Sequence, residues 1–165
     1  MIDLPATSQT VLAKVIVPAL GLLPSHMDTP EARVMLVAIA LQESGLRTRQ
    51  QVGGPAHGLW QNERLVQQLL IDNKASAADV CAVCKSRAVA PIASDMYWAL
   101  LTDDVFAAAI ARLILWCDPH PLPALGDVDD AWVCYQKNWG PGKPRPADWP
   151  GNYSTALAAV TGTAP

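Results

Sequence analysis

Apolar residues recur along this chain at helical spacing, in segments separated by short turns rich in proline and glycine. Apolar positions three and four residues apart mark one face of a helix, whereas strands alternate at every second residue. No such alternation is sustained anywhere in the chain. The pattern predicts an all-α protein whose helices begin after Thr7 or Ser8 and after Thr29, and then cover 65–70, 76–85, 91–101, 105–116, 127–139 and 150–160.

The most apolar of these segments runs from Ala32 to Leu41. It has a clear start signal, because Thr29 offers a capping hydroxyl, Pro30 suits the first turn and Glu31 lies near the positive end of the helix dipole. A helix that is apolar on all sides is buried in a core. We therefore expect the carboxyl group of Glu43 to lie at the inner end of a core helix.

That position suggests a chemical role for Glu43. Burial disfavours the ionised form of a carboxyl group and raises its pKa, so that the group retains a proton near neutral pH. A general acid needs this property. The alternative is that Glu43 only caps or solvates the end of its helix, and from this residue alone that simpler interpretation is favoured.

Composition limits the other possibilities. With 165 residues and 51% hydrophobic content the chain can form one domain, 1–165, with a proper core. The formal charge of −3 gives no indication of nucleic-acid binding. An anionic substrate would not be attracted by this net charge, so only a local basic lining of its site would help. No cofactor motif is present in the sequence, and we expect none.

The N-terminus and the cysteines are also informative. The residues after Met1 lack a basic segment followed by an apolar core, so no signal peptide is expected, and no apolar run has transmembrane length. The spacing of Cys81 and Cys84 is compatible with half a zinc site, but no second close pair or suitably spaced histidine follows. We expect four free thiols buried on apolar helix faces, and no metal site.

A motif appears when the segment from Glu43 to Gln61 is considered as a whole. Glu43-Ser44 precedes Gly58-Leu59-Trp60-Gln61 by fifteen residues, and Leu46 follows the acid. This arrangement resembles the lysozyme-like lytic transglycosylases, whose motif is Glu-Ser, a variable stretch, and Gly-Ala-x-Gly-Leu-Met-Gln. The chain departs from the family pattern at Val52, where a substrate-binding serine is common, and at Pro55, which replaces the first glycine.

A second resemblance lies near the C-terminus. Tyr135 and Gly140-Pro141-Gly142 are similar to the family's Ala-Tyr-Asn-Ala-Gly-Pro-Gly segment, with two extra residues between the tyrosine and the first glycine. Ala108 occupies the small-residue position of an internal family helix, and Asn152-Tyr153 resembles the opening of its last helix. The matches keep the same order across about 30–160, and they imply a lysozyme-like helical domain.

The resemblance implies cleavage of the β-1,4 bond between N-acetylmuramic acid and N-acetylglucosamine in peptidoglycan. It assigns Glu43 as the catalytic acid and a 1,6-anhydro sugar as the product. It also implies that Tyr135 faces the acid across the cleft. The expected substrate contacts are Ser44, Gln61, Tyr135, Trp60 and His57, with Trp139 as a further cleft wall.

Without a signal peptide, such a protein would belong to a phage virion or a host cell and would act at the periplasmic peptidoglycan. Its partners would be glycan strands and, in a phage, other particle components, with no nucleic acid and no membrane insertion. We read Trp98, Trp116, Trp132 and Trp149 as packing residues.

Two other functions remain open. A lysozyme on the same scaffold would hydrolyse the bond, but this chemistry needs a second carboxylate to activate water. No acid between Leu46 and Gln61 offers itself, although Asp103, Asp104 or Asp118 could fold back beside the cleft. Glu63 is a competing acid in a more polar stretch. The other function is a non-catalytic glycan-binding or virion structural protein that retains the fold, for which the departures at Val52 and Pro55 leave room.

Overall fold

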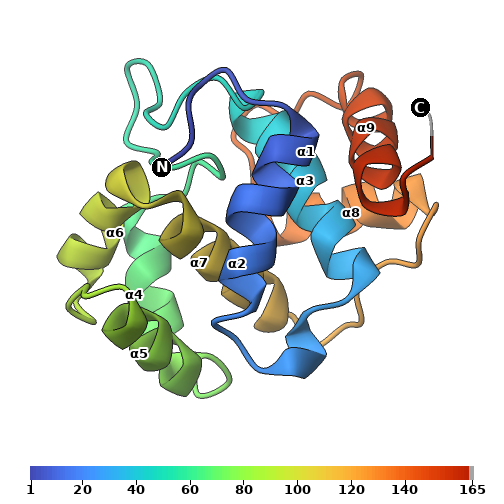
Figure 1. The fold of residues 1–165 in the computed structure, drawn as a ribbon. Coiled ribbons are helices and arrows are strands. Elements are labelled where there is room, and N and C mark those ends of the chain that lie inside the picture. Colours follow the sequence, from blue (N-terminus) through green and yellow to red (C-terminus); the bar gives the residue numbers. More distant parts are fainter. Residues whose placement is uncertain (164–165) are drawn as a thin grey trace.

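The computed structural model describes residues 1–163 and confirms the predicted fold class, because this part of the chain is helical and contains no strand. The extended pairing within it is limited to isolated antiparallel bridges that join His57 to Gln50 and to Asn62. Helices account for the core, and a long irregular segment, 45–63, follows the central helix (Figure 1).

The first helix begins at Thr7, whose hydroxyl accepts a hydrogen bond from the Thr10 amide, as predicted. It comprises α1 (Ser8–Val11), a π-helical turn (Leu12–Ile16) and α2 (Val17–Leu20). Pro18 therefore neither ends nor breaks the helix. Pro18 lies in the first turn of α2, directly after the π-helical turn. A π-helical turn is one way in which a helix accommodates a local irregularity such as a proline.

The central helix is α3 (Pro30–Ser44), and its start matches the prediction: the Thr29 hydroxyl accepts from the Ala32 amide at 3.2 Å, and Pro30 occupies the first turn. Residues 34–40 are all at most 1% exposed, because the first helix and three later helices surround α3: α7 (Asp104–Trp116), α8 (Val128–Trp139) and α9 (Trp149–Thr161). The helix ends at Gly45, which adopts the left-handed conformation with φ of 58° and bonds back to the Leu41 carbonyl.

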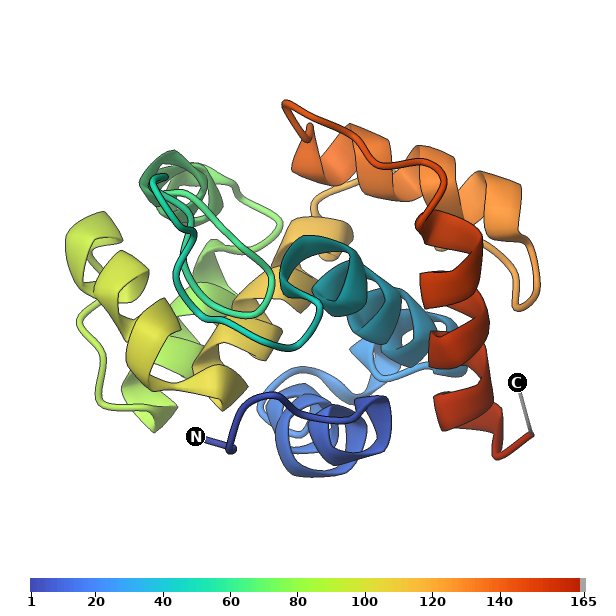
Figure 2. The same cartoon turned by 90° about the horizontal axis from the view of Figure 1, so that it is seen from above.

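The remaining helices lie on two sides of this centre. Helices α4 (Arg64–Asp72), α5 (Ala77–Ser86) and α6 (Ala93–Thr102) form one side, and α8 (Val128–Trp139) and α9 (Trp149–Thr161) form the other. Helix α7 (Asp104–Trp116) is buried along most of its length between them, capped by the Asp103 carboxylate. Figure 2, seen along α3, shows α8 and the segment before α9 on one side of the end of α3 and the irregular segment on the other.

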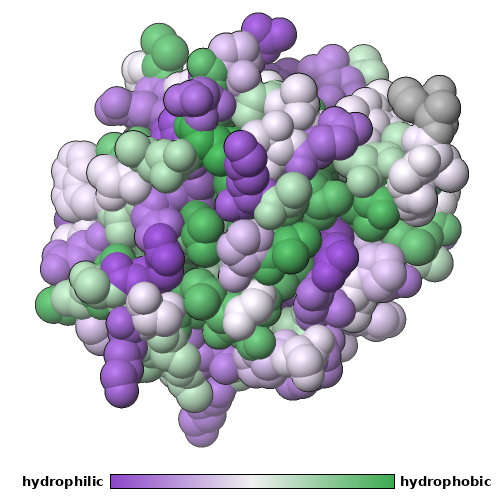
Figure 3. Space-filling view, in the orientation of Figure 1, coloured by the Kyte–Doolittle hydropathy of each residue, from purple (hydrophilic) through white to green (hydrophobic). Residues whose placement is uncertain are grey.

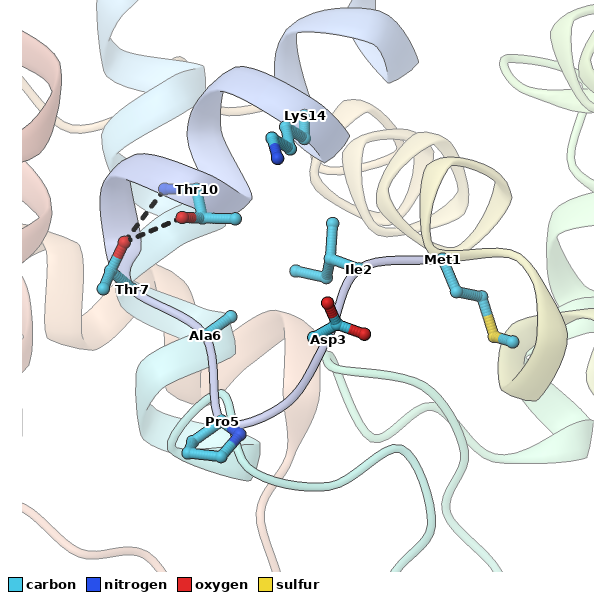
Figure 4. Close-up of a pocket in the computed structure, with 8 residues that line it drawn as sticks. All are labelled: Met1, Ile2, Asp3, Pro5, Ala6, Thr7, Thr10 and Lys14. Atoms are coloured by element: carbon cyan, nitrogen blue, oxygen red, sulfur yellow. Dashed lines mark hydrogen bonds between the residues drawn. The ribbon is translucent and has the colours of Figure 1, made fainter.

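The N-terminal residues are fixed to this irregular segment by a buried ion pair. Arg49 Nε lies 2.6 Å from Asp104 Oδ1, while the same two side chains bond the Ile2 carbonyl and amide. A cavity of about 360 Å³ lies beside this clamp. Figure 4 shows that residues of the N-terminal segment and the first helix line it, with Asp3 and Lys14 on its opposite sides.

The surface interleaves polar and apolar groups, and Figure 3 shows apolar side chains gathered across the middle of the face that carries α2 and α3. No helix within residues 1–163 is long and apolar enough to cross a membrane. Two packing predictions are wrong in part. Trp98 is 60% exposed on α6, and Cys81 is exposed on α5, since both lie on the outer sides of helices whose other faces contact the core. Cys84 and Trp149 are buried as expected, whereas Cys117, Cys134, Trp116 and Trp132 are only partly buried where they pack against the core.

Candidate active site

Glu43 lies in the last turn of α3, and Tyr135 of α8 faces it. The Tyr135 hydroxyl donates a hydrogen bond of 2.6 Å to Glu43 Oε1, across 92 residues of sequence. Tyr135 is 2% exposed and stacks on Trp149, with ring centroids 5.1 Å apart, so this packing fixes the position of its ring and hydroxyl group. The predicted pairing of this acid with this tyrosine is therefore present, despite the two extra residues after Tyr135.

The surroundings of Glu43 favour its protonated form. Burial raises the pKa of the Glu43 carboxyl group, against the opposing effects of the Tyr135 hydrogen bond and the positive charge of Arg145. Burial and the adjacent carboxyl group also raise the pKa of Tyr135, so the phenol stays protonated and acts as the donor. Because Tyr135 occupies Oε1, the carboxyl proton is free to reside on Oε2.

Glu43 opens into a cavity of about 570 Å³ between the end of α3 and the start of α9. This volume is within the range of small-ligand sites. Most of its lining residues are polar or charged, although apolar atoms form about half of its wall. The wall combines residues of the α3 end, the following turn, the segment before α9 and the first turn of α9: Leu41, Glu43, Ser44, Gly45, Arg47, Thr48, Arg145, Ala147, Asp148, Gly151 and Asn152.

The segment before α9 is tied to α3 by a buried amide. Gln42 is 2% exposed, and its side-chain nitrogen donates to the Arg145 carbonyl at 3.0 Å. In return the Arg145 guanidinium donates to the Gln42 carbonyl, and Asn152 Nδ2 donates to Gln42 Oε1 at 2.8 Å. These bonds satisfy the buried amide and hold the cavity wall beside Glu43. Sequence reasoning did not identify Gln42 or Arg145.

The turn at Gly58 is built by local backbone bonds. Gly58 has φ of 76°, and a Cβ atom there would lie 3.1 Å from the Leu100 carbonyl oxygen, so glycine is required for both conformation and space. Gln61 Nε2 donates to the Gly58 carbonyl at 2.7 Å. Gln61 thus stabilises the turn. It is not among the residues that line the Glu43 cavity, so its substrate role stays a prediction.

Trp60 is not a cleft wall. Its side chain is fully buried, and its indole nitrogen donates to the Leu36 carbonyl of α3 at 2.9 Å. The Trp60 carbonyl in turn accepts from the Trp139 indole at 2.9 Å. Trp139 lies four residues after Tyr135 on the same face of α8, so this helix contacts both Glu43 and the Gly58 turn. The bond from the Trp60 indole to Leu36 gives this aromatic side chain a structural role that does not involve a ligand.

His57 is also engaged within the protein. It is 4% exposed, its ring stacks on Tyr97 of α6 with a centroid distance of 3.9 Å, and its Nδ1 atom lies 3.2 Å from the Tyr97 carbonyl. The imidazole therefore joins the irregular segment to α6. The expectation that His57 forms a cleft wall is wrong, because the left-handed turn at Gly58 directs the adjacent segment toward the α6–α7 side.

Ser44 lines the cavity next to Glu43, as expected, but its hydroxyl is already bonded twice. It donates to the Ala40 carbonyl at 2.9 Å and accepts from the Leu46 amide at 3.3 Å. Leu46 has a positive φ of 54°, so this bond supports the sharp turn after α3. Ser44 thus has a structural role at the α3 end, and any substrate contact would use its remaining lone pair.

The other acids divide into two groups. Asp104 pairs with Arg49, Asp103 with Arg87 and Asp118 with Lys137, so each of the three distant candidates has a cationic partner elsewhere. Glu63 is exposed just before α4 and lies outside the cavity wall. The acid that shares the cavity with Glu43 is Asp148, which pairs with Arg145 at 3.2 Å and which sequence reasoning did not consider.

Within residues 1–163 no group of histidine, cysteine, aspartate and glutamate side chains has the geometry of a metal site. No protein-family model, curated protein or solved structure matches the chain. The assignment of a function therefore depends on the geometry of the site and on the motif resemblance.

Proposed function

We propose that this protein is a peptidoglycan lytic transglycosylase in which Glu43 is the catalytic acid and base. The observation that carries the proposal is the contact between Tyr135 and Glu43 at the wall of a cavity that also holds charged side chains, with a carboxyl pKa raised by burial. A lysozyme-like motif resemblance at both residues adds support. The substrate would be the glycan strands of periplasmic peptidoglycan, reached from a phage particle or from within the host cell.

The reaction would proceed in two proton transfers. Glu43 first donates its proton to the glycosidic oxygen, and the bond between this oxygen and the anomeric carbon breaks. The acetamido oxygen of the muramic acid residue bonds to the anomeric carbon in its place. The Glu43 carboxylate then removes the proton of the 6-hydroxyl group, whose oxygen attacks the anomeric carbon and displaces the acetamido group. The product is a 1,6-anhydro sugar, and no water is consumed.

The tyrosine would serve both steps. Its hydrogen bond to Oε1 stabilises the carboxylate that forms after the first transfer, and it orients the carboxyl plane so that Oε2 meets the substrate. Intramolecular attack by a hydroxyl group that is already held close gains a large advantage from proximity. A single carboxyl group is therefore sufficient for this chemistry.

Hydrolysis by a lysozyme-type mechanism is the second candidate, and one specific observation favours it. Asp148 lies in the wall of the same cavity, where a second carboxylate would be needed to activate water. Its ion pair with Arg145 keeps it occupied, and it is exposed to solvent, which makes it the weaker basis for a mechanism. Asp148→Asn should abolish cleavage only if hydrolysis is the reaction.

The experiment compares two glutamate-to-glutamine variants on purified peptidoglycan. Glu43→Gln should fold normally and release soluble fragments at least about a hundredfold more slowly, because glutamine retains the shape but cannot supply the proton. Glu63→Gln is the matched control and should retain most of the activity. Reversed results would show that the wrong acid is assigned. Absence of release by the unmodified protein, with binding to the glycan retained, would instead indicate a non-catalytic module.

A further inference from the structure

Arg47 stands out among the charged groups of the Glu43 cavity. The other guanidinium group, that of Arg145, is bonded to the Gln42 carbonyl and to Asp148. Arg47 lines the same cavity and is exposed, yet its guanidinium makes no hydrogen bond and no ion pair with any residue of 1–163. A permanently charged planar donor is therefore available to a ligand.

The backbone fixes the position of Arg47. The Arg47 amide bonds the Ser44 carbonyl at 3.1 Å, after the left-handed residues Gly45 and Leu46 have reversed the chain. The apolar stem of Arg47 lies over Gly45, with Cδ 3.7 Å from the position that a Cβ atom would take there. Arg47 thus lies one tight turn from Glu43 and lines the same cavity as the acid.

A neutral sugar offers no negative charge to the guanidinium group of Arg47. Guanidinium groups bind carboxylates through paired hydrogen bonds, and Arg suits this geometry better than Lys. The chain carries a formal charge of −3, so its overall field repels an anionic glycan, and a local cation is the means by which such a ligand is attracted. Asp148 neutralises Arg145 within the cavity, which leaves Arg47 as the cation without a partner among the described residues of its wall.

We propose that Arg47 binds a substrate carboxylate next to the bond that is cleaved, and that it thereby selects glycans that carry muramic acid over neutral N-acetylglucosamine polymers. This inference rests on the proposed function. The carboxylate belongs either to the lactyl group of a muramic acid residue without peptide or to the peptide stem attached to that group. Both sources present the same chemistry to a guanidinium group.

The test is a steady-state comparison of Arg47→Gln with Lys85→Gln. Lys85 is an exposed residue of α5, so the control removes the same charge far from the cavity wall. Arg47→Gln should raise KM for peptidoglycan about tenfold, with little change in kcat, because a charge-assisted bond made equally in the ground and transition states affects only binding. Arg47→Lys should recover part of the loss, and Lys85→Gln should match the unmodified protein.

Three substrates identify the carboxylate. Intact peptidoglycan carries stem carboxylates, amidase-treated glycan carries free lactyl carboxylates, and the same stripped glycan after chemical amidation carries none. A KM effect of Arg47→Gln on intact material alone assigns the stem, and an effect on stripped glycan alone assigns the lactyl group; effects on both indicate that either is accepted. An equal effect on the amidated glycan, or no effect on any substrate, would overturn the proposal.

Sedimentation with insoluble peptidoglycan separates this inference from the proposed function. If the unmodified protein binds the material without cleaving it, the enzyme assignment fails. Reduced binding of Arg47→Gln, with normal binding of Lys85→Gln, would then still support the carboxylate site. If the unmodified protein cleaves and both variants behave alike, only the Arg47 site is refuted.

Discussion

Two carboxyl groups, those of Glu43 and Asp118, bond to side chains of α8, and their pKa values are shifted in opposite directions. Glu43 receives one hydrogen bond from the helix, that of the neutral Tyr135 phenol, and burial raises its pKa. Burial would also raise the pKa of Asp118, but hydrogen bonds from Lys137, the His120 amide and side chain, and Asn138 hold it well below its ordinary value. The number and charge of the donors, more than burial itself, determine which carboxyl group retains a proton.

The difference also separates their roles. Asp118 is a permanent anion that fastens the loop after α7 to α8 through Lys137 at 2.8 Å and Asn138 at 3.1 Å. Glu43 has a single neutral donor and an adjoining cavity, so its proton can leave and return. Helix α8 thus supplies the partners of both groups: Lys137 and Asn138 bond the structural anchor Asp118, and Tyr135 bonds the candidate proton donor Glu43.

Tyr135→Phe removes the hydrogen bond to Glu43, and of the variants that compare Glu43 with Asp118 it should have the largest effect. Loss of the bond that stabilises the carboxylate should reduce kcat about tenfold or more. Because the hydrogen bond lowers the pKa of Glu43, its removal should raise that pKa, and the alkaline limb of the kcat/KM profile should move to higher pH. An unchanged profile would show that Glu43 is not the group that titrates.

The second prediction compares how the two carboxyl groups contribute to the free energy of unfolding. Asp118→Asn should lower the free energy of unfolding at pH 7 by about 1 kcal/mol, since its charged partner Lys137 is exposed and the ion pair is screened by solvent. Glu43→Gln should leave stability unchanged or raise it slightly, because a partly buried carboxyl group, whose ionised form burial disfavours, is replaced by an amide that cannot ionise. Denaturant unfolding of both variants measures the two changes.

The pH dependence of stability gives the sign of each effect. The folded pKa of Asp118 lies below its unfolded value, so its contribution is present above an ordinary aspartate pKa, about 4, and is lost as the pH falls toward the folded value. The folded pKa of Glu43 lies above its unfolded value, so its contribution is complete in acid and is lost as the pH rises through the folded pKa. Changes of the same sign in both variants would refute the comparison.

The sequence predicted the parts of the site that local patterns encode. Thr29-Pro30-Glu31 and the apolar run identified α3, and a carboxyl group at the end of a helix without a polar face had to be partly buried. The pairing of Tyr135 with Glu43 was available only through the motif resemblance, because nothing in helical spacing brings residues 43 and 135 together.

The errors and omissions have a common physical cause. Trp60 and His57 stand in the motif, but their side-chain directions depend on positive φ angles and on contacts with α3 and α6 that no local pattern specifies. Arg145 and Asp148 lie in the segment 141–148, which has no helical pattern and is placed by long-range bonds to Gln42. A polar residue within an otherwise apolar helix end, such as Gln42, was the one available signal.

The mass of the soluble products released from purified peptidoglycan tests the central claim most directly. If Glu43 acts alone as acid and then as base, every released fragment should end in 1,6-anhydro-N-acetylmuramic acid and should be lighter by one water than the hydrolysis product. Fragments with reducing ends throughout would contradict this account and would assign water activation to a second carboxylate, for which Asp148 is the candidate within the cavity.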